Sequence, residues 1–247
     1  MTASEHGVPE RGRPEYGGAI ETNRLLGALP KEELERLRPH LEFVELSQRD
    51  VLVEPNTPIS HVYFPIDGVM SLVVGTDAGR EVEAGTIGRE GMIGLPLFLG
   101  RATTPLRSFC QVPGSATRMA AEDFEREAVP GTRLHELLRQ YTEATFVFAA
   151  QSSACNRLHS IDQRCARWLL HTHDRVAGDE FSLTQQFLAQ MLGVRRAGVS
   201  EIASSFQQSG LIRYGRGVMR ILDREALEER SCECHRIIQK EFERLPD

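Results

Sequence analysis

The segment from Gln185 to Gly210 places the strongest constraint on what this chain of 247 residues can fold into. Its informative positions are Leu188, Ala189, Leu192, Gly193, Val194, Val199 and Ile202. This spacing fits two helices that cross over a short turn, because Ala189 leaves room for the crossing and Gly193 can adopt the positive φ of the turn. The segment therefore predicts a helix-turn-helix. The alternative, a plain helical hairpin, accounts for only part of the pattern.

The residues after this segment, 210–222, read as two short strands that turn at Gly215-Arg216-Gly217, which predicts a wing. In such a unit the second helix, here from about Arg195 to Gln208, presents its N-terminal residues to base edges in the major groove. The start of the first helix and the wing are placed to contact backbone phosphate. The predicted DNA-binding residues are Thr184, Gln185, Arg195, Arg196, Gly198, Ser200, Arg213 and Arg216.

The distribution of charge agrees with a polyanion partner for the C-terminal part only. Residues 1–156 carry 15 basic and 22 acidic side chains, a net charge of −7, whereas residues 157–247 carry 14 and 13, a net charge of +1. The segment from Phe181 to Leu222 contains five arginines and only one acidic residue, Glu201. The excess of negative charge elsewhere argues against nonspecific nucleic-acid binding by the whole chain.

The N-terminal half has a different pattern. Residues 1–20 are rich in charge, Gly and Pro and predict a disordered tail without a signal peptide. Residues 21–130 open with a short helical stretch and continue as short β-type runs separated by turn residues, which favours an antiparallel β-roll or jelly roll. Closely spaced glycines between Gly85 and Gly100 predict that the backbone of this stretch lies close to a ligand or to another backbone segment.

Residues 131–159 predict one long helix with an apolar stripe of alternating three- and four-residue spacing, as in a coiled-coil seam. We expect this stripe to form a homodimer interface through Leu134, Leu138, Tyr141, Phe148, Ser152 and Cys155. The alternative is a long helix packed on its own β-roll. Ser160 and Gln163 fit a capping box, so a new helix and the domain of residues 160–247 begin there.

Other function classes find little support in the sequence. No apolar run reaches the 18 to 20 residues, roughly, that a membrane span needs. The five cysteines are expected as free thiols in a reducing cytosol. Cys232-Glu233-Cys234-His235 resembles a metal-binding run, but we expect it within a helix, where residues two apart point to different faces, so no metal site is predicted. No catalytic constellation is recognisable, so an enzyme is not expected.

A β-roll, a long helix and a C-terminal winged helix-turn-helix follow one another in the same order in the Crp/Fnr family of bacterial transcription regulators. This chain resembles that family over roughly residues 22–225, most strongly from Leu183-Thr184-Gln185 to Ser209-Gly210-Leu211-Ile212. The resemblance implies an α+β fold and a cytoplasmic homodimer that binds palindromic double-stranded DNA, responds to an effector and has RNA polymerase as a further partner. The segment Gly91-Met92-Ile93-Gly94-Leu95 looks like the family's ligand-binding cassette, which implies Gly91, Gly94, Leu95, Arg101 and Arg107 as effector-binding residues.

The departures from the family pattern limit what the effector can be. Members that bind cyclic nucleotides carry Gly-Glu-Leu in the cassette and an arginine about ten residues later, but here Gly94 precedes Leu95-Pro96, and Arg101 and Arg107 are out of register. A buried phosphate without its arginine is costly, so a cyclic nucleotide is not expected. The first cysteine is Cys110, so the N-terminal ligands of an iron–sulfur sensor are absent.

Changes in the second helix predict a distinct operator. The family's Arg-Glu-x-x-x-Arg pattern becomes Arg196-Ala197-Gly198-Val199-Ser200-Glu201. Two other functions stay open at this point: a regulator that needs no effector because its β-roll is only a scaffold, and an enzyme that uses the β-roll as a substrate pocket.

Overall fold

The computed structural model describes residues 20–76, 79 and 81–245, and the tail predicted for residues 1–20 lies outside this range except for Ile20. The chain enters through four short helical segments before the first strand. They are η1 (Ile20–Thr22), α1 (Arg24–Gly27), α2 (Lys31–Leu37) and η2 (Arg38–His40). Asn23 caps α1 by accepting hydrogen bonds from the backbone N–H groups of Leu25 and Leu26, and its amide donates to the carbonyls of Pro65 and Gly91. This segment is thereby fixed to the domain that follows.

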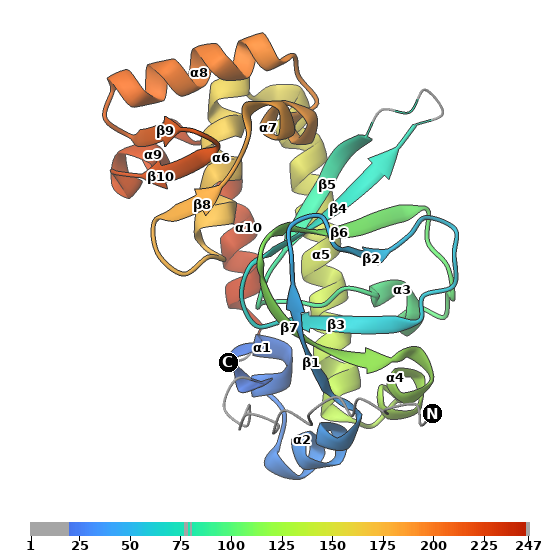
Figure 1. Cartoon of the computed structure of the whole chain (residues 1–247). Helices are drawn as coiled ribbons and strands as arrows, with labels where there is room; N and C mark the ends of the chain where they lie inside the picture. The colour runs from blue at the N-terminus through green and yellow to red at the C-terminus, as the bar shows by residue number, and fades with distance from the viewer. Residues whose placement is uncertain (1–19, 77–78, 80, 246–247) are drawn as a thin grey trace, which may run out of the picture.

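Seven strands form two antiparallel sheets that face one another (Figure 1). One sheet has the order β1-β7-β3, and the other has the order β2-β6-β4-β5. The strands are β1 (Glu42–Leu46), β2 (Val51–Val53), β3 (His61–Pro65), β4 (Val69–Gly75), β5 (Glu81–Ile87), β6 (Leu106–Val112) and β7 (Gly114–Ala120). We call these strands the β-roll. The short helices α3 (Leu95–Phe98) and α4 (Ala121–Glu127) complete it.

Helix α5 (Arg133–Leu158) runs along the β-roll for 26 residues, as the sequence predicted (Figure 1). The Thr132 hydroxyl caps it by accepting from the backbone N–H of His135 at 3.1 Å. At the other end the helix stops at Leu158, and helix α6 (Ile161–His173) starts after the predicted capping box, in which Gln163 Oε1 accepts from the Ser160 N–H at 3.1 Å. The chain therefore bends at residues 159 and 160.

The C-terminal part contains a small sheet and four further helices. They are β8 (Glu180–Ser182), α7 (Gln185–Leu192), α8 (Arg196–Gln208), β9 (Ile212–Gly215), β10 (Val218–Ile221), α9 (Arg224–Arg230) and α10 (Cys234–Glu243). We call residues 161–230 the DNA-binding unit. The sheet has the order β8-β10-β9, so a third strand joins the predicted two-stranded wing. The α+β fold class predicted from the sequence is confirmed.

Two hydrophobic cores hold these parts together, and the last helix belongs to the first of them. Ile238 and Phe242 of α10 lie in the core of the β-roll and α5, although the sequence grouped residues 160–247 together. The Arg24 guanidinium donates to the carbonyls of Phe242 and Leu245, which holds this end of the chain against α1. No helix in the described ranges is long and apolar enough to cross a membrane.

Candidate nucleic-acid interface

The turn between α7 and α8 has the geometry that the sequence pattern predicted. Thr184 caps α7 by accepting from the backbone N–H of Phe187 at 3.1 Å. Gly193 ends the helix with φ +66°, a left-handed conformation that side chains with a Cβ adopt only at a cost. The backbone N–H of Val194 donates to the carbonyl of Ala189 at 2.9 Å, which closes the turn. Helix α8 then starts at Arg196.

Apolar side chains fix the crossing of the two helices. Leu188 and Leu192 of α7 and Val199 of α8 are buried in the second core, and Ile202 packs against it half-buried. Phe206 is buried farther along α8. Because Val199, Ile202 and Phe206 lie on one face of α8, its opposite face is left to the solvent at the outer edge of the molecule (Figure 1).

The N-terminal end of α8 carries the predicted base-reading residues. Arg195 and Arg196 are exposed, and neither forms a side-chain ion pair with another residue in the described part of the chain. Gly198 has open space where a Cβ would lie, so the groove-facing surface is flat there. Ser200 donates to Gln185 Oε1 at 2.6 Å, so these two predicted contact residues lie together and bond to each other across α7 and α8.

The wing turn lies beside the start of α7, where the backbone N–H of Leu183 donates to the Gly217 carbonyl at 2.8 Å. Arg216 and Gly217 form the two-residue turn between β9 and β10 with φ +53° and +78°, the type I′ geometry that fits the twist of a hairpin. Arg213, Arg216 and Arg220 are exposed and, among the residues described, take part in no ion pair. Positive charges without an acidic partner on an outer surface suit a polyanion such as phosphate backbone.

The Crp-like helix-turn-helix domain family matches residues 163–230 of the chain. The fold is similar to that of a crp/fnr family transcriptional regulator from Eubacterium rectale, with 18% sequence identity, a TM-score of 0.66 and coverage of 87% of this chain and 99% of that one. Residues 163–230 are thus a Crp-like helix-turn-helix domain, and the chain as a whole shares the fold of this solved structure. FixK2 from Bradyrhizobium japonicum is also similar, with 16% identity, a TM-score of 0.66 and coverage of 78% and 98%.

A third similar structure is a CRP/FNR family transcriptional regulator from Thermus thermophilus, with 18% identity, a TM-score of 0.62 and coverage of 76% of this chain and 97% of that one. The comparison with curated proteins gave no match. The comparisons therefore show a Crp-like helix-turn-helix domain at residues 163–230, a type of domain that binds DNA, within a fold similar to that of these regulators.

The β-roll holds an apolar cavity of about 200 Å³. Gly94 and Leu95, two of the residues predicted to bind an effector, line it together with Tyr141 and Thr145 of α5. Gly91 lies against Tyr141 instead, since a Cβ there would come within 2.5 Å of that ring. The cavity thus connects the predicted cassette to the long helix.

Arg101 and Arg107 do not line this cavity, so the structure does not bring them together with Gly94 and Leu95. Arg101 is exposed after α3. The Arg107 guanidinium lies on the outer side of the sheet, at 3.7 Å from Glu54 and 3.6 Å from Glu81, and stacks over the Phe109 ring. Both side chains point elsewhere, so the cavity wall offers no cation to a phosphate group.

The predicted dimer stripe on α5 is buried within the single chain, so its assignment to a partner contact is corrected. The six residues are Leu134, Leu138, Tyr141, Phe148, Ser152 and Cys155. Helix α10, far away in sequence, covers part of the stripe, with the Phe242 ring 6.2 Å from that of Tyr141 and 6.1 Å from that of Phe148. The face of α5 that stays open is the opposite one, where Phe146 is 74% exposed.

A buried polar junction joins the β-roll to the DNA-binding unit, and the sequence gave no sign of it. Glu83 of β5 accepts from the indole N–H of Trp168 on α6 at 2.6 Å and lies 2.7 Å from the Ser71 hydroxyl. Burial raises the pKa of Glu83 to about 7, against the opposing effect of these hydrogen bonds. Burial thus favours the protonated form of this carboxyl group.

A buried ion pair forms the second contact across the junction. Glu90, in the loop after β5, accepts from Arg175, just beyond α6, at 2.8 Å. Gly88 makes room for this arginine, because a Cβ at that position would come within 2.7 Å of its side chain. Removing one partner would leave the other charge buried and unpaired, so the pair fixes the two parts relative to each other.

Proposed function

We propose that the regulator is a homodimer that binds a two-fold-symmetric operator by placing the N-terminal end of α8 in the major groove of each half-site. The observation that carries this proposal is the exposed pair Arg195 and Arg196 at the start of α8, which form no ion pair among the described residues. Arginine can bond a guanine edge through two donors or hold a phosphate, and the wing is placed for the flanking backbone.

The exposed face of α5 supports a dimer contact. Phe146, Ala149, Ala150 and Ser153 follow one another at helical spacing on this face, and all four are exposed in the single chain. A phenylalanine exposed to 74% among small residues is suited to packing against the same helix of a second copy. The dimer contact that we propose therefore replaces the buried stripe by the opposite side of the same helix.

The β-roll cavity supports an apolar effector of small size. Its walls are almost entirely apolar and hold no arginine, so a neutral molecule fits better than a cyclic nucleotide. Tyr141 and Thr145 of α5 share the wall, and a ligand that pressed on them would change the helix that we assign to the dimer contact. A regulator that needs no effector would be indicated if operator binding were complete without any ligand. As a transcription regulator we place it in the cytoplasm, with RNA polymerase as a further partner.

The test is the substitution Arg196→Ala, measured on an operator selected from random DNA and on a scrambled duplex of the same length. If Arg196 reads a base, the loss of affinity on the operator should be about 5- to 150-fold, the equivalent of roughly 1–3 kcal/mol, and much smaller on the scrambled duplex. Arg101→Ala is the matched control, because it removes one exposed arginine from the β-roll. Equal losses on both duplexes would make Arg196 a phosphate contact, and no loss on either would contradict the interface.

A further inference from the structure

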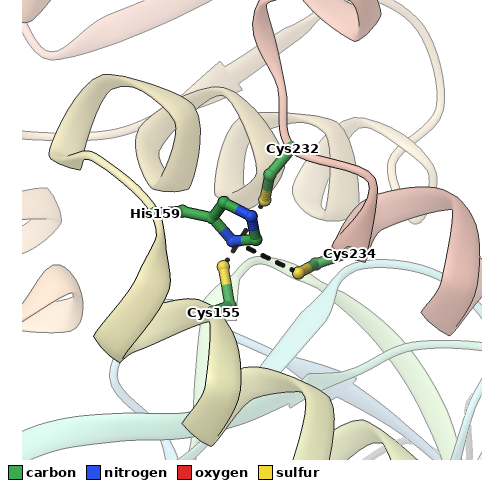
Figure 2. Close-up of side chains that lie close together, drawn as sticks. All are labelled: Cys155, His159, Cys232 and Cys234. Carbon is green, nitrogen blue, oxygen red and sulfur yellow. Dashed lines mark hydrogen bonds between the residues drawn. The ribbon is translucent and has the colours of Figure 1, made fainter.

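Three cysteines and one histidine converge where the long helix ends. Cys155 and His159 lie on the last turns of α5, and Cys232 and Cys234 lie at the connection between α9 and α10 (Figure 2). Their ligand atoms, three Sγ and one imidazole nitrogen, all lie within 4.8 Å of one another. The two pairs are 77 residues apart in sequence, so tertiary folding alone brings them together.

The sequence argument against a metal site at Cys232 and Cys234 assumed one continuous helix. The structure places a break there, because α9 ends at Arg230 and α10 begins at Cys234. Cys232 therefore lies in the connection, and its side chain can point in the same direction as that of Cys234. Figure 2 shows both sulfurs directed at the His159 ring and at Cys155.

The distances fit one tetrahedral ion. With metal bonds of about 2.3 Å to sulfur and 2.0–2.1 Å to nitrogen, a tetrahedral site separates two sulfurs by about 3.8 Å and a sulfur from a nitrogen by about 3.6 Å. Here Cys155 Sγ and Cys232 Sγ are 3.5 Å apart, and Cys234 Sγ is 3.5 Å from His159 Nδ1. A four-iron cluster would need its ligands much farther apart, so a single ion fits better.

The surroundings of these four residues match those of a metal site. His159 Nε2, the ring nitrogen that faces away from the sulfurs, lies 3.4 Å from the Glu233 carboxylate, which is the usual orienting partner of a metal-bound histidine. The Gln151 amide donates to Cys234 Sγ at 3.1 Å. Arg164 and Arg167 of α6 interact electrostatically with Cys155, and their charge would balance a site with three thiolates.

We propose that Cys155, His159, Cys232 and Cys234 bind one zinc ion that ties the end of α5 to the start of α10. Thiolate and imidazole ligands favour zinc over magnesium or calcium, which prefer oxygen. The three cysteines are buried, and four protein ligands leave no open position, so the ion is structural. The proposed ligand His159 directly precedes Ser160, where the chain bends between α5 and the DNA-binding unit.

Zinc at this bend would hold the orientation of the DNA-binding unit relative to α5, because α10 is itself packed on α5 and the β-roll. Removal of the ion would free the bend from α10. The site is independent of the proposed operator and effector, and it can be tested without DNA.

The experiment measures metal and thiols in the full-length protein after purification without a histidine tag and with a thiol reductant. We expect one zinc per chain by mass spectrometry of the metals, and cobalt exchanged into the site should show the visible bands of tetrahedral thiolate coordination. Cys232→Ser should lower bound zinc at least tenfold, by loss of a ligand. Cys110→Ser, which changes another buried cysteine in the β-roll, should leave bound zinc unchanged.

Glu233→Gln provides a variant that keeps the fold, since this side chain is more than half exposed. It should lower zinc affinity about 10- to 100-fold in competition with a chromophoric chelator, because His159 loses its orienting carboxylate. Wild-type protein that is free of metal and does not take up added zinc would overturn the proposal. Bound iron in place of zinc would overturn it as well.

Discussion

The carboxyl group of Glu83 should make the stability of the regulator depend on pH around neutrality. Burial, which disfavours the charged form, explains why it holds a proton, and its hydrogen bonds oppose this effect only in part. The Ser71 hydroxyl lies 2.7 Å from Glu83 and 2.6 Å from Gln111 Oε1, but it has one proton to donate. If Glu83 is protonated it can donate to Ser71, which donates in turn to Gln111 Oε1, so both short contacts of the Ser71 oxygen are then hydrogen bonds.

The magnitude follows from the raised pKa. Glu83 has a pKa of about 7 in the folded chain, against 4.5 for the ordinary side chain. The folded state therefore binds the proton more tightly than the unfolded state, so stability is greatest at low pH and falls as pH rises from about 4.5 through 7. The full effect is about 3 kcal/mol, of which about 2 kcal/mol lies between pH 5.5 and 8.

The assay is urea unfolding at one protein concentration, at several pH values between 5.5 and 8, with Glu83→Gln beside the wild type. Glutamine does not titrate, so the difference in free energy of unfolding between the two proteins should change by about 2 kcal/mol over this range. Glu45→Gln, at an exposed position on β1, is the matched control. A difference between wild type and Glu83→Gln that is the same at every pH would refute the reasoning.

Two further predictions concern the dimer contact and the helix-turn-helix. Phe146→Asp should convert the dimer to monomers in light scattering, because it puts a charge into the proposed contact. The control Leu99→Asp, at an exposed site on the β-roll, should leave the dimer intact. A Phe146→Asp protein that stays dimeric would contradict the assigned face. Gly193→Ala should lower the free energy of unfolding by about 1–2 kcal/mol, because the backbone φ at this position is +66°. Gly198→Ala, in a regular helix with open space for a Cβ, should raise the free energy of unfolding by about 0.5–1 kcal/mol. Equal shifts of the two variants in chemical denaturation would refute this account.

The helix-turn-helix could be predicted from sequence because its determinants are local. Gly193, Leu188 and Val199 lie within a dozen positions, and each has a role that follows from backbone geometry or helical spacing. The bend at Ser160 was predictable for the same reason, since a capping box is read from four consecutive residues.

Features that depend on contacts between distant segments could not be predicted. The stripe on α5 is apolar, but only the return of α10, with Phe242 against Tyr141 and Phe148, shows that it faces inward. Strand β5 contains Glu81 and Glu83 and has too little apolar alternation to be recognised as a strand. The cysteine and histidine cluster needs a break between α9 and α10 that no Gly or Pro marks in the sequence.

The most direct test of the central claim is selection of DNA by the full-length regulator from a randomised duplex pool at about 150 mM salt, where specific binding stands above the salt-dependent background. The pool should also be tested with cell extract as a source of effector. We expect a two-fold-symmetric motif with half-sites about one helical turn apart, read by the arginines at the start of α8. Failure to enrich any motif, with and without extract, would contradict the account.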